Sequence, residues 1–76
     1  MLPEAERARL LREWRSSTPD LDTAEGIAAE RTRIIDLGVA GVLDDRTVEV
    51  GLDGLASVLR GLEAAERARR RGAAKA

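Results

Sequence analysis

The side chains that could do chemistry in this 76-residue sequence are few, because it contains neither histidine nor cysteine. It therefore lacks an imidazole base, a thiolate nucleophile and the usual cysteine and histidine ligands of zinc. Ser16, Ser17 and Ser57 have no histidine to activate them, and Lys75 lies near the C-terminus. We expect no catalytic residue, no cofactor and no small-molecule substrate, and hence a protein that is not an enzyme.

Adjacent acids and glycines are the next candidates, for a metal ion and for a phosphate. Asp44 and Asp45 are neighbours, but a hard cation needs several oxygen ligands in a fixed arrangement. Adjacent acids at the start of a helix are more typical of helix caps. The segment 51–54, Gly-Leu-Asp-Gly, lacks the glycine spacing and the lysine of a phosphate-binding loop. We therefore predict no metal site and no nucleotide site.

The one cluster with a functional character is basic and consists of Arg67, Arg69, Arg70 and Arg71. Clustered arginines neutralise phosphates, so these residues are candidate nucleic-acid contacts and DNA is a possible partner. The alternative is a solvent-exposed helix end whose cations complement the helix dipole. No aromatic residue lies among the arginines to stack on bases, and the sequence pI is about 5.4. These two observations favour the solvent-exposed helix end.

Charge is distributed unevenly behind a net charge of −1. Residues 1–15 carry +1, residues 16–63 carry −6, and residues 64–76 carry +4, which describes an acidic body with a basic C-terminal end. No apolar run approaches the roughly 20 residues that span a bilayer. The N-terminus also lacks the basic and then apolar layout of a secretory signal. We expect a soluble, cytoplasmic protein without membrane contact.

The elements that position these side chains are predicted to be helices. Alanine, arginine, glutamate and leucine dominate, and all four are strong helix formers. Trp14 is the only aromatic residue, whereas a small sandwich or barrel draws on aromatic and β-branched residues along its strands. A chain this short also builds a marginal core on its own. The sequence therefore predicts an all-α fold that oligomerisation completes.

Residues 1–15 are predicted to hold a short helix that begins at Pro3. Its apolar stripe is narrow and consists of Leu10, Leu11 and Trp14, so this helix must dock on something else. Trp14 is equally typical of a small core and of an interface anchor. Residues 16–22 then break the pattern and are predicted to form a linker.

A second helix is predicted over about 23–43. Either Thr18 caps it with Pro19 following, or Asp22 caps it with Glu25 completing a capping box. Apolar and small residues recur at helical spacing along one stripe. Its predicted inward positions are Ala24, Ile27 or Ala28, Arg31, Ile34 or Ile35, Gly38 and Val42. Arg31 either extends its head outward to solvent or pairs with Glu63 or Glu66, of the same chain or of another subunit.

A third helix is predicted over about 46–71, with Asp44 or Asp45 as its N-cap. A seam at alternating spacings of four and three residues consists of Val48, Leu52, Leu55, Leu59 and Leu62. The alternative is a short strand over 47–50, which the helix-weakening Gly51 and Gly54 favour but which has no partner strand. Gly72 is predicted to stop the helix and leave 72–76 as a flexible tail.

The second and third helices are predicted to form an antiparallel hairpin over 23–71, and to expose more apolar surface than the short first helix covers. We expect a non-catalytic assembly or adaptor protein that self-associates or binds a protein partner through this hairpin. The predicted interface residues are Ile27, Ile34, Ile35, Leu52, Leu55, Leu59, Leu62 and Trp14. The alternative is an oligomer that binds nucleic acid through its basic C-terminal ends.

In layout, residues 22–71 resemble the oligomerisation core of the small terminase subunits that phages and phage-derived particles use in DNA packaging. The shared features are two helices joined by a short acidic turn, leucine-rich facing seams and a basic end. No specific sequence motif contributes to the resemblance. It implies a ring of subunits that contacts DNA and a packaging motor. This chain would then lack the separate helix-turn-helix domain that many such subunits carry.

Overall fold

The computed structural model describes residues 2–75, and this range contains three α-helices and no strand. The helices are α1 (Glu4–Ser16), α2 (Ala24–Val39) and α3 (Asp45–Lys75). The predicted all-α fold is therefore confirmed. Met1 and Ala76, the outermost residues of the predicted N-terminal segment and tail, lie outside the described residues.

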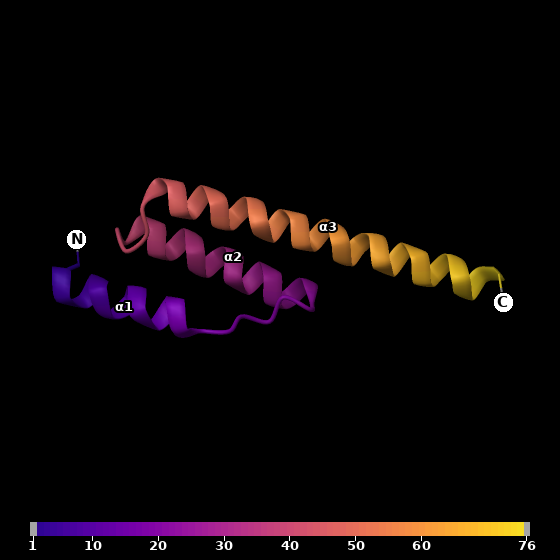
Figure 1. Ribbon diagram of the computed structural model, residues 1–76, viewed down its shortest axis with the longest axis horizontal. Helices are drawn as coiled ribbons and strands as arrows, with labels where there is room; N and C mark the ends of the chain where they lie inside the picture. Colours follow the sequence, from indigo (N-terminus) through magenta and orange to yellow (C-terminus); the bar gives the residue numbers. More distant parts are fainter. Residues whose placement is uncertain (1, 76) are drawn as a thin grey trace.

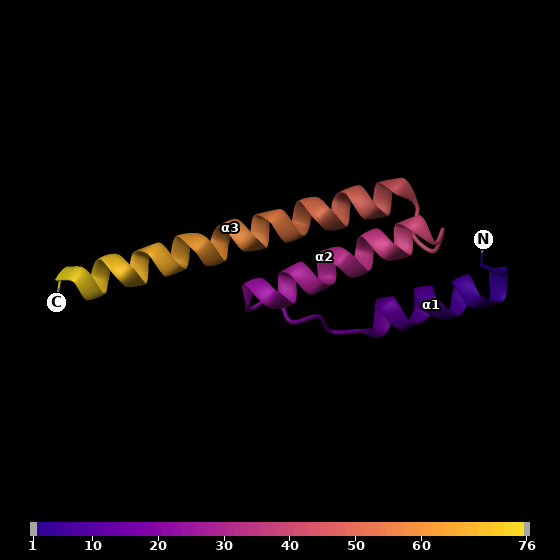
Figure 2. The same cartoon turned by 180° about the vertical axis from the view of Figure 1, so that it is seen from behind.

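The molecule is long and thin, with extents of 58, 19 and 14 Å. Figures 1 and 2 show α3 running back alongside α2 in the opposite direction, α1 lying along α2, and the second half of α3 continuing past the start of α2. The radius of gyration is 16.2 Å, whereas a compact domain of this length has about 11 Å. Much of the surface of these helices is therefore not covered by the chain itself.

The core lies mainly between α2 and α3 and is small. Its buried apolar side chains are Ile27, Ile34, Leu43 and Leu55. Partly buried side chains pack around them, namely Leu11, Trp14, Leu21, Leu37, Val48, Leu52, Leu59 and Leu62. Two glycines let the helices approach, because a Cβ at Gly38 would lie 2.8 Å from a Val48 methyl and one at Gly51 would lie 3.1 Å from an Ile34 methyl.

The start of α2 is fixed by a short polar turn. The Thr23 hydroxyl accepts a hydrogen bond from the Gly26 N–H at 3.0 Å, and is therefore the N-cap. The Asp20 carboxylate accepts bonds from the Asp22 N–H and the Thr23 hydroxyl. The predicted caps at Thr18 and Asp22 are therefore wrong. The Asp20 carbonyl also packs on Gly26, where a Cβ would lie 2.0 Å from its oxygen.

The corner between α2 and α3 is longer than predicted, because α2 ends at Val39, four residues before 43. Gly41 has φ +78°, a left-handed conformation that glycine adopts without strain. This turn points Leu43 into the core, where it is buried. The Asp44 carboxylate accepts a hydrogen bond from the Thr47 N–H at 2.7 Å, so of the two predicted caps, Asp44 and Asp45, it is Asp44 that caps the next helix.

The long helix α3 agrees with the favoured prediction at its start and extends beyond the prediction at its end. Residues 47–50 are helical, so the strand alternative is wrong and the favoured helix is confirmed. The helix also continues through Gly72 to Lys75, beyond the predicted end at 71. One glycine costs a helix about 1 kcal/mol, and the alanines that follow it are the strongest helix formers. Gly72 alone is therefore not enough to end α3.

Candidate interaction surface

A polar network attaches α1 to α2. The Trp14 indole N–H donates to a carboxylate oxygen of Glu30 at 2.9 Å, and this glutamate is only 7% exposed. Arg33 lies 3.8 Å from the other Glu30 oxygen and donates to the Ser17 hydroxyl at 2.9 Å. The Ser17 hydroxyl in turn donates to the Trp14 carbonyl at 2.7 Å. The network therefore joins the end of α1 to the middle of α2.

Apart from this network, α1 is loosely packed. None of its described residues is buried, and only Leu11 and Trp14 pack against the core. The Cα atoms of α2 and α3 come within 8 Å of each other, whereas in the described chain those of α1 approach neither helix so closely. On its exposed side, Arg9 pairs with Glu6 and Glu13. Long side chains, above all Trp14, therefore hold α1 in place.

The buried stripe of α2 is rotated from the predicted one. Ile27, Glu30 and Ile34 are buried, whereas Arg31 is exposed. The predicted inward position of Arg31 is therefore wrong, and Glu30 was missed. Both stripes have spacings of three and four residues, so the apolar pattern fits either. The two stripes differ in which charged residue faces α1. The Trp14 indole N–H is a hydrogen-bond donor, so it can pair with the Glu30 carboxylate but not with the Arg31 guanidinium.

The face of the α2–α3 pair away from α1 holds a shallow groove. It is lined by Ala24, Ile27, Ala28, Arg31, Thr32, Ile35 and Leu59. None of the described α1 residues lines it, and Ala24, Ala28 and Ile35 lie more than a quarter of a turn around α2 from Glu30. Leu52 and Ala56 share the Leu59 side of α3 by helical spacing. We call this surface, residues 24, 28, 31, 35, 52, 56 and 59, the open face.

The predicted interface residues fall into three groups. Ile27, Ile34 and Leu55 lie in the core of the chain itself. Half-buried around that core are Leu52, Leu59, Leu62 and Trp14. Ile35 is exposed, at 39% of its surface, and lies on the open face. The structure thus brings the eight residues into one region, but only some of them remain accessible to a partner.

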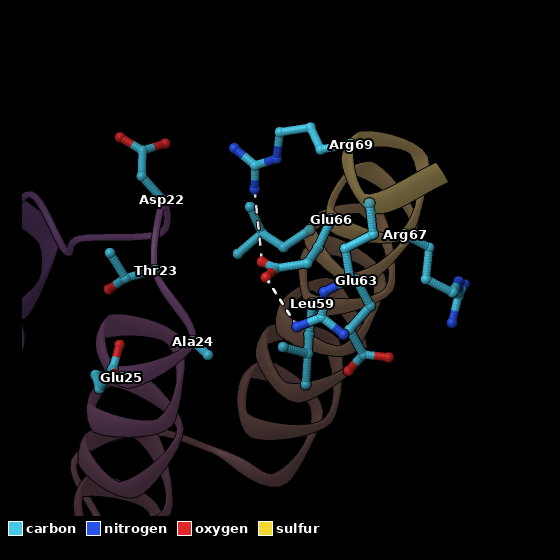
Figure 3. Close-up of a pocket in the computed structure, with 11 residues that line it drawn as sticks. Asp22, Thr23, Ala24, Glu25, Leu59, Glu63, Glu66, Arg67 and Arg69 are labelled. Atoms are coloured by element: carbon cyan, nitrogen blue, oxygen red, sulfur yellow. Dashed lines mark hydrogen bonds and ion pairs between the residues drawn. The ribbon is translucent and has the colours of Figure 1, made fainter. Parts of the chain in front are cut away.

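The predicted nucleic-acid contacts lie on the part of α3 that continues past α2. Arg67, Arg69, Arg70 and Arg71 are all exposed. Glu66 pairs with Arg69 at 3.5 Å and with Arg70 at 3.2 Å, which occupies two of the four. Figure 3 shows Arg69 turned towards Glu66, and Arg67 on the side of α3 away from α2. In the described part of the chain, Arg67 and Arg71 form no ion pair.

Acidic and basic residues line the hollow between the start of α2 and this part of α3. Asp22 and Glu25 lie on one side, and Glu63, Arg69 and Arg70 on the other. No ion pair crosses the hollow among the residues described. Within the same range there is no group of three acids placed to hold a metal ion, and no helix long and apolar enough to cross a membrane.

Comparison with known proteins adds no further information about this surface. No protein-family model matches the chain, and neither a curated protein nor a solved structure matches it. The functional interpretation therefore rests on the geometry of α2, α3 and the open face.

Proposed function

We propose that this protein is a non-catalytic assembly or adaptor module whose α2–α3 hairpin associates with a second copy through the open face. The observation that carries the proposal is the groove that α1 leaves uncovered, with Ile35 39% exposed beside Leu59. Covering the exposed apolar surface of Ile35 with a neighbouring helix is favourable, because it removes that surface from water. Ala24 and Ala28 lie on the same side of α2, about three and two turns before Ile35, and are small enough for a second helix to approach.

The surface area of the chain supports a partner of its own size. Its accessible surface is 5808 Å², whereas a compact monomer of 8.2 kDa exposes about 4,500 Å². The difference is about 1,300 Å², to which the exposed residues 63–73 of α3 contribute, and a stable protein interface buries about 800 Å² of each partner. Covering the open face with the same face of another copy would form a four-helix bundle, in which each hairpin supplies two helices.

Arg31 is the one charged residue of the open face, and it limits how the two copies can meet. Its guanidinium has no ion-pair partner among the described residues. A charged group that is covered without a partner is costly. An acid of the second copy, such as Glu63 or Glu66, would remove that cost and set the register of the two hairpins. Alternatively, the stem of Arg31 packs on the apolar surface and its head stays in water.

The test is to replace Ile35 with aspartate and to measure the mass in solution by sedimentation equilibrium at micromolar concentration. Ile35 is already exposed in the single chain, so a charge there should leave the monomer folded. We expect the wild type to be larger than 8.2 kDa and Ile35→Asp to sediment as a monomer. Val58→Asp is the matched control, because Val58 is 37% exposed and lies about 100° around α3 from Leu59. A wild-type monomer, or an unchanged mass for Ile35→Asp, contradicts the proposal.

A second candidate function is nucleic-acid binding by basic ends gathered in an assembly. The observation that favours it is the exposure of Arg67 and Arg71, neither of which has an ion-pair partner within residues 2–75. A salt-dependent shift of duplex DNA is then expected, lost when all four clustered arginines become glutamine. No binding at low salt rules this function out.

A further inference from the structure

Opposite charges occupy opposite ends of this molecule. The basic end is residues 64–75 of α3, which we call the arm; it carries five basic residues and one acid. The acidic end is residues 36–53, which we call the acidic corner; it carries five acids and one arginine. Figures 1 and 2 show the turn between α2 and α3 near one end and the C-terminus of α3 at the other.

The arm has no packing partner among the residues that the structure describes. Every residue from 63 to 73 is exposed, and α3 runs about 20 Å past Leu62, the last half-buried residue of its seam. It has no apolar face of its own, and an isolated polar helix of this length is marginal in water. Glu66 neutralises part of the charge of Arg69 and Arg70, which leaves Arg67 and Arg71.

The acidic corner packs on the core through its apolar residues, but its acids are exposed and have no ion-pair partner among the described residues. Its acids are Asp36, Asp44, Asp45, Glu49 and Asp53, and all five are exposed. Asp44 caps α3, but none of the five forms an ion pair in the described chain. The net charge of the corner is −4 and that of the arm is +4. Two copies of this chain are therefore complementary in charge only in one relative orientation.

We propose that two copies pair antiparallel, so that the arm of each lies against the acidic corner of the other. This inference rests on the proposed self-association through the open face and adds its orientation. In the parallel orientation, arm would meet arm and corner would meet corner, and like charges brought together disfavour the pairing. In the antiparallel orientation both arms are used at once, by a twofold axis that closes the assembly as a dimer.

The open face and the arms have different roles in this dimer. Burial of apolar surface on the open face supplies most of the affinity. Each exposed ion pair contributes little to the free energy of association and is screened by salt. The arms therefore mainly determine the orientation of the two copies and make the affinity depend on salt. Asp22, Glu25 and Glu63 line the same hollow as Arg67, Arg69 and Arg70 and lower the net field of the arm. The Arg67 side chain extends to the side of α3 away from Asp22 and Glu25 (Figure 3), and Arg71 does not line the hollow, so these two arginines are the best placed to meet a partner.

The first experiment is sedimentation equilibrium of the full chain at low and at high salt. We expect a mass of twice 8.2 kDa and a dimer that weakens as salt rises. Arg67→Gln with Arg71→Gln should raise the dissociation constant about three- to tenfold at low salt. Arg12→Gln with Arg15→Gln is the matched control, because it removes the same charge from exposed residues of α1 and should leave the dimer unchanged.

The second experiment reads the orientation directly, because the chain has no cysteine and single ones can be introduced. Ala68→Cys labels the arm, and Val39→Cys labels the corner; both positions are exposed. With a short bis-maleimide, a mixture of the two variants should give the mixed cross-linked dimer. Ala68→Cys alone should give little cross-linking, whereas a parallel dimer would link its two arms efficiently.

Failure of this inference can be told apart from failure of the proposed function. If the wild type is a monomer at every salt concentration, both the proposed self-association and the antiparallel pairing are wrong. If Ile35→Asp abolishes the dimer but neither salt nor the arm variants alter it, self-association stands and the charge pairing is wrong. Efficient arm-to-arm cross-linking, or assemblies larger than a dimer, also overturns the antiparallel pair. The pairing is also overturned if the chain binds duplex DNA and the arm variants abolish that binding without changing the mass of the dimer, because the arm would then bind phosphates.

Discussion

Replacing Trp14 with phenylalanine tests how α1 is held on α2. Phenylalanine keeps most of the apolar ring at this half-buried position but removes the N–H that donates to Glu30. Glu30 is 7% exposed, so water cannot fully replace the lost donor. A hydrogen bond to a charged group contributes about 1.5–3 kcal/mol. We therefore expect Trp14→Phe to weaken the docking of α1 on α2 by about 1.5–3 kcal/mol.

The loss should act locally before it acts on the whole molecule. A chain of this size has a total stability of about 4–11 kcal/mol, so the docking term is a large part of it. No described residue of α1 is buried, and α2 and α3 keep their own core when α1 leaves. We therefore expect α1 to detach and fray while the α2–α3 pair stays folded.

Native-state hydrogen exchange measures this directly. Amide exchange in α1 should become about ten- to a hundredfold faster in Trp14→Phe, with little change in the middle of α2. A double-mutant cycle with Glu30→Leu supplies the control, because the two single changes remove the same bond. We expect a coupling energy of at least about 1 kcal/mol between them. Additive effects, or equal acceleration in all three helices, would show that the Trp14–Glu30 bond does not hold α1.

Two further predictions concern the starts of α2 and α3. Gly26→Ala should destabilise the chain by about 1–3 kcal/mol in urea unfolding, because its Cβ would lie 2.0 Å from the Asp20 carbonyl oxygen. Gly61→Ala is the control on open helix surface and should stabilise the chain by up to about 1 kcal/mol. Hydrogen bonds from the Thr47 side chain and N–H hold the pKa of Asp44 below its ordinary value, so the stabilisation by this cap is present at neutral pH and is lost as the pH falls below about 4. Asp44→Asn caps without titrating and should therefore flatten that part of a curve of stability against pH.

The features predicted correctly are those decided by neighbours in sequence. Asp44 caps α3 because its carboxylate reaches an N–H three residues on, which a single turn of chain determines. The start of α2 shows the limit of that reasoning, since several polar residues compete there and differ little in capping energy. Thr23 is chosen because Asp20 turns the linker back across Gly26. That packing depends on the path of the whole linker and not on any one residue.

The extent of the accessible surface could not be predicted, because apolar periodicity does not distinguish a core of the same chain from an interface. Ile34 and Ile35 are adjacent and chemically identical, yet Ile34 faces α3 and is buried whereas Ile35 lies on the open face. The distinction depends on which side of α2 packs on α3, where the Ile34 methyls lie against Gly51. Since Gly51 lies 17 residues further along the chain, no local pattern in α2 contains that information.

The contact between Trp14 and Glu30 bears on what kind of assembly is possible. A twofold dimer needs one self-complementary face, whereas a ring of the kind implied by the resemblance to small terminase cores needs two different faces on each subunit. With α1 docked through Trp14 and Glu30, one side of the α2–α3 pair is occupied and the open face is the one left. Under the proposed self-association, the docked state favours a closed pair. Release of α1 would then uncover a second side of the α2–α3 pair, through which larger assemblies would become possible.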